Sequence, residues 1–159
     1  MQKFIPILAL FLISLGVTGQ EQNDEKAIKQ VIDTFFEGLH KGDSTIMKKT
    51  LHKDIKIQTT ATTRNGQKIL RTELRQNLLT NVANKKPEMV YFEKLLSYDI
   101  KVDGNLASVW TPYEFYVNKN FSHCGANSFQ LFNNNGTWQI IYIVDMRRRD
   151  NCEALKNKK

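Results

Sequence analysis

Three runs near the end of the chain combine aromatic and β-branched residues with the alternation of β-strands. They cover residues 106–117, 121–132 and 138–147, and such residues fit a pleated, half-buried surface. Asn-rich segments at 118–120 and 133–136 separate the runs, and Asn and Gly tolerate the positive φ that tight hairpins need. The pattern predicts two successive antiparallel hairpins.

These turns set the register of the strands, so residues can be assigned to the two faces of the predicted sheet. One face is expected to be apolar at one end and polar at the other. Its polar end is expected to bring together Tyr113, His123, Asn127, Asp145 and Arg147. In this register His123 lies opposite Arg147. Gly125 lies opposite Asp145 and leaves open space beside that carboxylate.

The opposite face is expected to end in large apolar side chains that need a cover. These are Trp110, Phe132, Trp138, Ile140 and Tyr142. The C-terminal tail could lie over them, held down through Cys152, or a second copy of the chain could pack against them. Because the tail from Asp150 onward is short and polar, we expect a homodimer through this face.

Helices are predicted before the long strands. Apolar residues recur at three- and four-residue spacing in 27–39, after a possible N-cap at Asn23 or Asp24. Gly42 is expected to end this helix, and Asp43 to cap a second, shorter one. Residues 54–63 alternate as a strand that turns at Asn65-Gly66. A third helix is predicted over residues 70–84, with an apolar stripe formed by Leu70, Leu74, Leu78, Leu79 and Val82. Helices followed by a meander predict an α+β fold with helices on one face of a bent antiparallel sheet.

The first residues have the features of a secretory signal peptide. Lys3 precedes an apolar run over 4–17, and small residues follow at 17–19. A membrane anchor is the alternative, but the run is short and no basic stop-transfer cluster follows it. We therefore expect a signal peptide over 1–19, one domain over 20–149 and a basic tail over 150–159. The protein is expected to be exported, periplasmic or secreted, without stable membrane insertion after cleavage.

Both cysteines, Cys124 and Cys152, would remain after cleavage. Because an exported chain meets oxidising conditions, we expect a disulfide that ties the tail to the sheet. Two free thiols acting as a metal or redox pair are the alternative.

The chain is basic, with a formal net charge of +7. Much of the positive charge sits at 147–149 and in the lysines of the tail, where such runs are usually solvated and keep a protein soluble. An exported chain rarely meets nucleic acid, and exposed aromatics do not interleave with these basic residues. Nucleic acid is therefore not an expected partner.

Several motifs resemble the nuclear transport factor 2-like superfamily. They are Lys41-Gly42-Asp43, the segment Leu51-His52-Lys53-Asp54-Ile55, and the last hairpin Asn135-Gly136-Thr137-Trp138-Gln139-Ile140. Segments 110–116 and 122–125 also resemble exported, uncharacterised bacterial members. The resemblance implies a cone-shaped curved antiparallel sheet wrapped around three N-terminal helices, a fold shared with ketosteroid isomerase and polyketide cyclases.

The isomerase's catalytic positions do not carry over to this chain. Its general-base aspartate falls on Thr59 and its oxyanion-donating tyrosine on Phe35. Threonine is not a base near neutral pH and phenylalanine donates no hydrogen bond. Isomerase chemistry by that route is therefore not expected.

The polar end of the sheet predicts a small-molecule site made of Tyr113, His123, Asn127, Asp145 and Arg147. In the catalytic hypothesis, Asp145 orients His123 as a general base, and Arg147 or Asn127 steadies an oxyanion. In the structural alternative, Asp145 pairs with Arg147 and the others close hydrogen bonds at the sheet rim.

The remaining histidines, His40 and His52, are expected at solvated ends on separate elements, so neither a metal nor a cofactor is expected. The sequence thus predicts an exported small-molecule-binding domain with a pocket between the helices and the curved sheet. A lyase, isomerase or hydrolase that uses His123 and Asp145, or a non-catalytic dimeric assembly module, are the alternatives.

Overall fold

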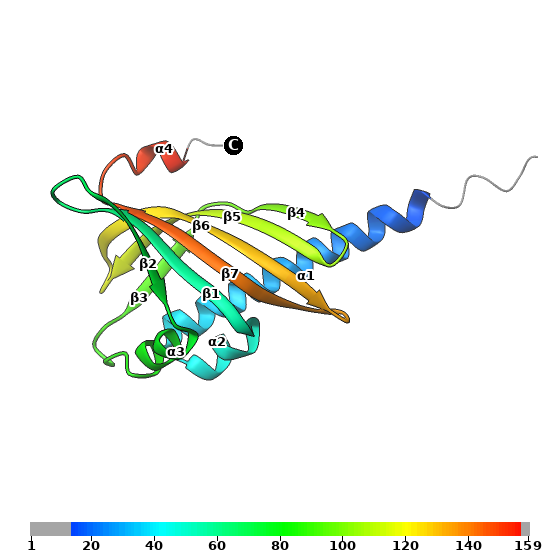
Figure 1. Ribbon diagram of the computed structural model, residues 1–159, viewed down its shortest axis with the longest axis horizontal. Coiled ribbons are helices and arrows are strands. Elements are labelled where there is room, and N and C mark those ends of the chain that lie inside the picture. The colour runs from blue at the N-terminus through cyan, green and yellow to red at the C-terminus, as the bar shows by residue number, and fades with distance from the viewer. Residues whose placement is uncertain (1–13, 157–159) are drawn as a thin grey trace, which may run out of the picture.

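A computed structural model describes residues 14–156 of the chain. Figure 1 shows a long helix lying across one curved sheet, with two short helices gathered at one end of it. The elements are α1 (Ser14–Lys41), α2 (Ser44–Thr50), β1 (Leu51–Thr62), β2 (Lys68–Glu73), α3 (Arg75–Ala83), β3 (Tyr91–Leu95), β4 (Asp99–Asp103), β5 (Leu106–Val117), β6 (Asn120–Asn134), β7 (Thr137–Arg148) and α4 (Glu153–Lys156).

The sheet has the strand order β2-β1-β7-β6-β5-β3, and β4 pairs with the other half of β5. Every neighbouring pair is antiparallel except β1 and β7, which are parallel. This arrangement confirms the predicted α+β cone. The parallel pair matters for the site, because it brings β1 beside the end of β7.

Two corrections concern the helices. The predicted cap at Asn23 or Asp24 is wrong, since α1 is already helical from Ser14. Asp24 instead accepts a hydrogen bond from Nε1 of Trp138 at 3.1 Å, which ties α1 to β7. The predicted third helix starts too early, because Leu70 belongs to β2 and Leu74 is the N-cap of α3. Both leucines are exposed, at 60% and 66%.

Asp43 caps α2 as predicted. Its side chain accepts hydrogen bonds from the backbone N–H groups of Thr45 at 2.8 Å and Ile46 at 3.1 Å. Gly42 precedes it with φ +69°, the left-handed conformation that glycine adopts most readily. This sharp turn directs α2 back toward the sheet.

The core lies between α1 and the inner face of the sheet. Ile28 and Ile32 of α1 are fully buried, as are Leu131 and Ile140 of the sheet. The ring of Phe36 meets that of Phe129 edge-on, with centroids 6.1 Å apart, a favoured geometry for aromatic pairs.

The last hairpin turns more tightly than predicted, and this moves two residues of β7 to the inner face. The expected register, with His123 opposite Arg147, sets Phe132 opposite Trp138. In the structure Phe132 pairs with Gln139, and a two-residue loop joins Asn134 to Thr137. A shift of one residue exchanges the faces of a strand. Trp138 and Ile140, predicted on the outer face, are therefore 4% and 0% exposed in the core.

A β-bulge then restores the predicted faces further along β7. Gln130 pairs with Tyr142 but Leu131 pairs with Ile140, which leaves Ile141 as an extra residue. Ile141, predicted on the inner face, is the bulged residue and is half-buried. Beyond it the register has shifted by two residues in total, so the inner and outer faces are again those expected.

The C-terminal tail folds onto the outer face. Cys124 and Cys152 form a disulfide with their Cα atoms 5.8 Å apart, which confirms the expected pairing. Leu155 of α4 is buried, and α4 lies against β5. The tail thus covers part of the outer face, but Trp110 further along β5 remains 48% exposed.

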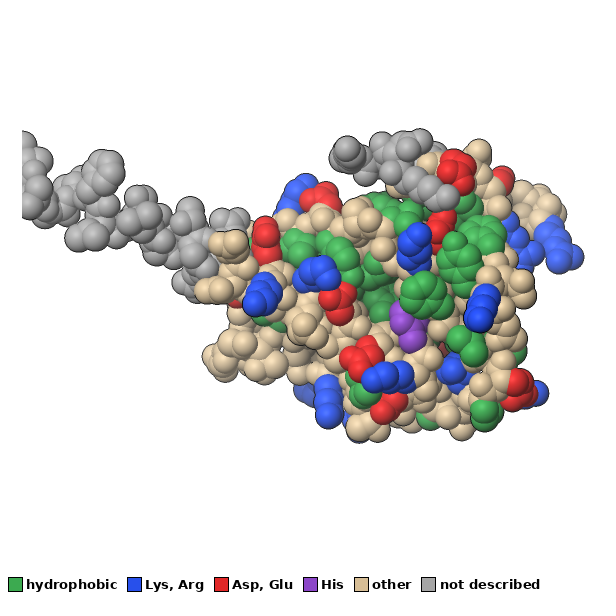
Figure 2. All heavy atoms as spheres, turned by 180° about the vertical axis from the view of Figure 1, so that it is seen from behind, with side chains coloured by type: hydrophobic (Ala, Val, Ile, Leu, Met, Phe, Trp, Pro, Cys, Tyr) green, Lys and Arg blue, Asp and Glu red, His purple; other side chains and the backbone are tan. Residues whose placement is uncertain are grey.

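The predicted signal segment falls mostly on residues 1–13, which lie outside the described residues. Within the described part of the chain, no helix is long and apolar enough to cross a bilayer. On the face seen in Figure 2, basic and acidic side chains are interspersed, as is usual for a solvated surface.

Candidate functional site

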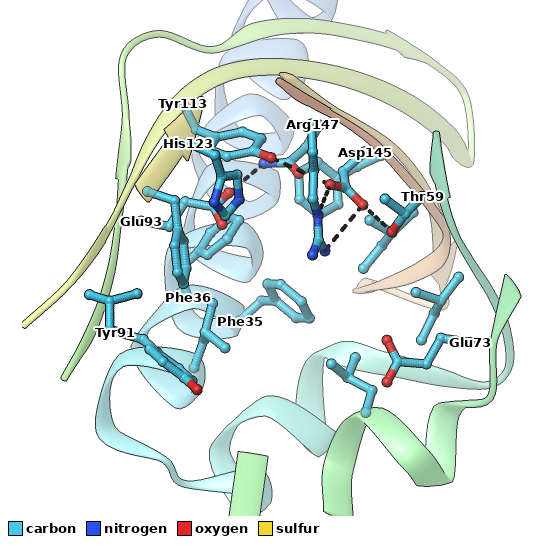
Figure 3. A pocket seen from close by; sticks show the side chains of 18 of the residues that line it. Phe35, Phe36, Thr59, Glu73, Tyr91, Glu93, Tyr113, His123, Asp145 and Arg147 are labelled. Atoms are coloured by element: carbon cyan, nitrogen blue, oxygen red, sulfur yellow. Dashed lines mark hydrogen bonds and ion pairs between the residues drawn. The ribbon is translucent and has the colours of Figure 1, made fainter. Parts of the chain in front are cut away.

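A cavity of about 410 Å³ lies at the open end of the cone, between the helices and the sheet. Aromatic rings form much of its wall: Phe35 and Phe36 from α1, Tyr91 from β3, Phe115 from β5 and Phe129 from β6. Figure 3 shows Tyr113, His123, Asp145 and Arg147 above Phe35 and Tyr91, close to the sheet, while Glu73 lies lower in the view. The polar residues in the wall are Thr59, Glu73, Glu93, Tyr113, His123, Asn127, Asp145 and Arg147.

All five side chains that the sequence placed at the polar end of the sheet line this cavity. Their register differs from the expected one, however. Gly125 pairs with Arg147 and Asn127 pairs with Asp145, a shift of two residues. One step of the shift comes from the tighter turn and the other from the bulge. An even shift keeps each side chain on its face, which is why the five residues still converge.

Gly125 does not leave open space beside Asp145, so that expectation is wrong. A Cβ at this position would lie 1.7 Å from the carbonyl oxygen of Met146 and 2.9 Å from the hydroxyl of Tyr113. The missing side chain lets the backbone of β7 and the Tyr113 ring approach β6 closely. The glycine shapes the floor of the cavity rather than enlarging it.

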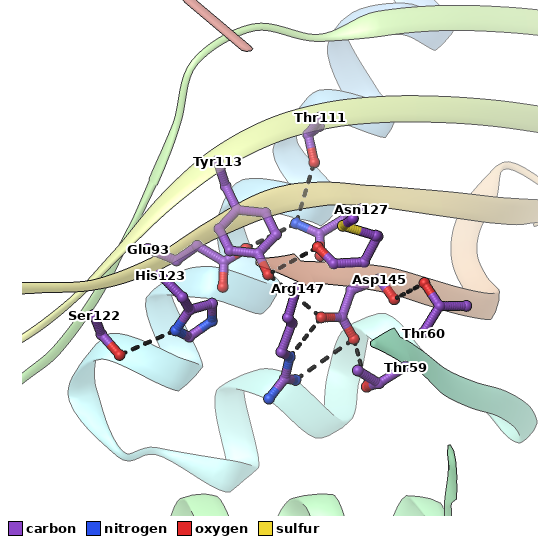
Figure 4. Close-up of polar contacts among 11 residues, drawn as sticks. Thr59, Thr60, Glu93, Thr111, Tyr113, Ser122, His123, Asn127, Asp145 and Arg147 are labelled. Atoms are coloured by element: carbon purple, nitrogen blue, oxygen red, sulfur yellow. Dashed lines mark hydrogen bonds and ion pairs between the residues drawn. The ribbon is translucent and has the colours of Figure 1, made fainter. Parts of the chain in front are cut away.

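Asp145 is held by donors from three side chains (Figure 4). Thr59 Oγ1 donates to Oδ1 at 2.5 Å, and Arg147 Nε donates to Oδ2 at 2.6 Å. The Tyr113 hydroxyl makes a longer bond to Oδ2 at 3.4 Å. Thr59 reaches Asp145 because the parallel pairing of β1 and β7 sets the two residues side by side. The pairing of Asp145 with Arg147 matches the structural alternative from the sequence.

His123 is oriented by other groups than Asp145. Its Nδ1 lies 3.1 Å from the Ser122 hydroxyl oxygen, and its ring stacks on Phe115 with centroids 4.8 Å apart. Burial, reinforced by the positive charge of Arg147, lowers the pKa of His123 to about 4. The imidazole is therefore neutral at neutral pH, and the catalytic role suggested by the sequence stays a prediction.

Glu93 and Glu73 are acidic residues of the cavity wall that the sequence did not predict, and Glu93 is the one bonded to the predicted set. It lies on β3, and its Oε1 accepts a hydrogen bond from Nδ2 of Asn127 at 2.7 Å. Burial raises the pKa of Glu93 to about 7, and nearby Asp145 acts in the same direction. The alternation of Tyr91, Glu93 and Leu95 was the available signal, because these residues share a face of their strand.

His40 links α1 to the strand that carries Glu93. Its Nε2 accepts a hydrogen bond from the backbone N–H of Glu93 at 2.9 Å, and burial lowers the pKa of its imidazole. The expectation that His40 is a solvated end is therefore wrong. Phe92, which is 48% exposed, lies next to it with ring centroids 5.1 Å apart. Figure 2 shows hydrophobic side chains beside a histidine on this face.

Comparison with protein families identifies the domain. A family model described as "Putative lumazine-binding" matches residues 23–144, more than half of the 159-residue chain. The chain belongs to this lumazine-binding family. The matched region runs from α1 into β7 and contains Glu93, His123 and Asn127, while Asp145 and Arg147 follow just after it.

Solved structures give the fold of this lumazine-binding family member. An NTF2-like protein of unknown function from Shewanella baltica OS155 is 19% identical, with a TM-score of 0.58 over 80% of this chain and 96% of that chain. An NTF2-like protein with a cystatin-like fold from Novosphingobium aromaticivorans is 13% identical, with a TM-score of 0.67 over 95% and 100%. These matches confirm the fold that the resemblance to the nuclear transport factor 2-like superfamily implied.

A third match comes from a multi-subunit enzyme. It is the beta subunit of a putative aromatic-ring-hydroxylating dioxygenase from Novosphingobium aromaticivorans DSM 12444, which is 16% identical, with a TM-score of 0.65 over 80% of this chain and 90% of that chain. The search of curated proteins gives no match. At these low identities the likeness establishes the fold, while activity has to be argued from the cavity itself.

The cavity offers little for a metal ion. Within residues 14–156, His, Cys, Asp and Glu side chains form no group of three or more that could hold one. Its polar groups instead offer hydrogen bonds of both kinds. Arg147 donates, neutral His123 can do either through its ring nitrogens, and Glu93 changes role with its protonation state.

Proposed function

We propose that the protein binds a compact ring-shaped small molecule in the cavity at the open end of its sheet. One observation carries the proposal: the cavity of about 410 Å³ has a wall that combines aromatic rings with a few convergent polar side chains. Small-molecule sites have this size and composition. The family description, lumazine binding, supports a fused-ring heterocycle as the ligand.

The contacts among the polar residues favour binding over turnover. Asp145 is engaged by Thr59 and Arg147 and does not orient His123. The aromatic wall and the Asp145–Arg147 pair are suited to hold a planar ligand by stacking and hydrogen bonding.

The test is direct binding of lumazine, followed by its fluorescence or by calorimetry. We expect saturable binding by the wild type and at least about tenfold weaker binding by Leu78→Trp, because Leu78 lines the cavity and an indole there would fill it. The control is Leu106→Trp, which changes a leucine on the far half of β5 that is 49% exposed. Absence of binding by the wild type, or equal binding by the Leu78 variant, would contradict the proposal.

We also propose that two copies associate through the outer sheet face. With Trp138 and Ile140 in the core, the surface consists of Trp110, Phe132 and Tyr142, of which Trp110 is 48% exposed. A large exposed aromatic supports an interface. Light scattering is expected to give twice the monomer mass for the wild type and the monomer mass for Trp110→Glu. A monomeric wild type at about 100 µM, well above typical dimer dissociation constants, would refute the dimer.

Export is likewise a proposal, supported by the charged and apolar start of the sequence and by the Cys124–Cys152 disulfide. Full-length protein expressed in bacteria is expected outside the cytoplasm, with its N-terminus at about residue 20. Recovery of the uncleaved chain from the cytoplasm would refute it.

A further inference from the structure

We propose that the cavity recognises a hydrogen-bond acceptor on its ligand, a carbonyl oxygen or a ring nitrogen, through a Glu93 that is protonated in the complex. This inference rests on the proposed ligand-binding function and names the chemistry that the ligand presents. It makes Glu93 a specificity-determining residue, and it makes binding depend on pH.

The geometry around Glu93 leaves one end of its carboxyl group to a ligand. Oε1 is held by Asn127 at 2.7 Å, and the same Asn127 amide nitrogen also donates to Thr111 Oγ1 at 3.4 Å. Asn127 is buried, so its amide is fixed and supports the carboxyl group from one side. Figure 4 shows the Glu93 carboxyl between Asn127 and His123, at the wall of the cavity.

The second carboxyl group of the cavity differs in its partners. Asp145 is bonded to the side chains of Thr59 and Arg147, with Arg147 supplying a charged donor at 2.6 Å. Glu93 has a neutral amide as the hydrogen-bond partner of its carboxyl group among the described residues. A carboxylate without a charged donor in an apolar wall is costly, whereas the neutral acid can donate a proton to an acceptor.

The other groups near Glu93 fix the charge of the cavity around neutral pH. Burial holds the pKa of His123 at about 4 and lowers that of His40, so both imidazoles are neutral. Burial raises the pKa of the Tyr113 hydroxyl, which stays protonated. The charged pair Asp145–Arg147 and the carboxyl group of Glu73 on β2 complete the set. Glu93, whose pKa is raised to about 7 by burial, is therefore the group that titrates.

A cationic ligand would be the alternative, held by ionised Glu93. Arg147 is paired with Asp145, and Glu73 lines the same cavity, so a cation would bind more tightly at the higher pH, where Glu93 is ionised. A ligand acceptor meets two donors instead, the Glu93 hydroxyl and the Arg147 guanidinium. These two donors favour a ring compound with a carbonyl or ring-nitrogen edge.

The experiment measures lumazine binding to the full chain at about pH 6 and about pH 8, with the ionisation of lumazine followed in parallel by absorbance. A ligand that needs protonated Glu93 is expected to bind about tenfold more weakly at about pH 8, since one proton is linked to binding. Calorimetry in two buffers of different ionisation enthalpy is expected to show uptake of up to one proton per ligand.

The variant Glu93→Gln tests whether binding depends on the protonation of the Glu93 carboxyl group. Its amide oxygen can still accept from Asn127 and its N–H₂ group can donate to the ligand, so binding is expected to become independent of pH. Glu37→Gln is the control, because Glu37 is a surface residue paired with Lys41. This control is expected to keep the wild-type ratio of about tenfold between the lumazine affinities at about pH 6 and about pH 8. If Glu93→Gln does not fold, the infrared band of a protonated carboxyl group in the wild type, recorded with and without lumazine, gives the same answer.

The outcomes separate the two proposals. Binding that Leu78→Trp weakens, but that is equally strong at both pH values, would overturn the role of protonated Glu93 and leave the proposed function intact. Tighter binding at the higher pH would also overturn it, since ionised Glu93 would then be the recognising form. Absence of lumazine binding at both pH values would overturn the proposed function as well as the role of Glu93.

Discussion

The two ends of the curved sheet are built differently although they share strands. At the closed end, Leu131 of β6 and Ile140 of β7 are fully buried beneath α1, and Trp138 is almost so. At the open end, the same two strands carry Asn127 and Asp145 beside a cavity of about 410 Å³. One end is filled with hydrocarbon and the other is left hollow and polar. Under the proposed function, stability and ligand recognition therefore depend on successive segments of one hairpin.

The bulge at Ile141 marks the boundary between these segments. On one side of it Ile140 faces the core, and on the other side Ile143, Asp145 and Arg147 face the cavity. Without the extra residue, the two segments of β7 could not both turn their inner residues toward α1.

Deletion of Ile141 should therefore have the largest effect of any small change in the hairpin. Either Trp138 and Ile140 or Asp145 and Arg147 would have to face outward, and we expect the protein to lose more than about 4 kcal/mol of unfolding free energy or to fail to fold. Urea unfolding followed by circular dichroism measures this. Ile141→Ala, which keeps the bulge and removes a half-buried side chain, is the control and should cost about 1 kcal/mol. A deletion variant as stable as this control would show that the bulge does not set the faces.

A pair of leucines compares the two ends directly. Leu131 is fully buried at the closed end, and Leu131→Ala should destabilise the fold by about 3 kcal/mol, because it opens a new hole in a filled core. Leu78 is half-buried and already faces the cavity, so Leu78→Ala should cost about 1 kcal/mol. Thermal or urea unfolding of the two variants checks the ratio, and equal losses would contradict the distinction between the ends.

The sequence could predict the fold because strand alternation and helical periodicity are local signals. It could also predict that Asp145 and Asn127 converge, but from a register that lacked two one-residue shifts. The tighter turn and the bulge each shift β7 by one residue, and two shifts restore the face. Trp138 and Ile140 lie between the two shifts, so their placement was wrong. Nothing local decides which residues of 133–136 form the loop, since all of them favour turns.

Glu93 could not be predicted for a different reason. The irregular segment 96–98 separates its strand from β4, so the register of the later hairpins does not extend to it. Its partner Asn127 is 34 residues away in the chain, and contacts of this range depend on the folded sheet. The raised pKa of Glu93 is likewise a property of burial in the cavity.

The disulfide could be predicted from the sequence, because a chain that is expected to be exported and has two cysteines has one way to pair them.

The disulfide should matter for the stability of the open end without changing its cavity. Cys124 and Cys152 are 28 residues apart, and the bond restricts the unfolded chain. The combined variant Cys124→Ala with Cys152→Ser should lose about 2 kcal/mol, less than the full entropic estimate because pairing of β6 with β7 already closes most of the loop. Lumazine affinity should stay within about twofold, since both cysteines lie on the side of the sheet away from the cavity. A loss of binding in a variant that remains folded would show that the tail shapes the cavity.

The smallest expected effect is the dependence of stability on pH at the open end, because two groups there act in opposite directions. The folded-state pKa of Glu93 is raised from 4.5 to about 7, so the native state binds the extra proton and the contribution of Glu93 to stability falls as pH rises through this window. The folded-state pKa of His123 is lowered from 6.5 to about 4. The unfolded state then binds the extra proton, and the contribution of His123 rises with pH over that range.

Between about pH 4.5 and about pH 6.5 the two contributions oppose each other, and single variants should separate them. The unfolding free energy of Glu93→Gln minus that of the wild type should rise with pH in this window, because the falling contribution has been removed. The same difference for His123→Gln should fall with pH. Urea unfolding at several pH values measures both differences, in which the other titrating groups cancel. If both differences changed with pH in the same direction, one of these side chains would not be buried in the cavity wall as the structure has it. The contrast between a filled end and a hollow, titrating end would then not hold.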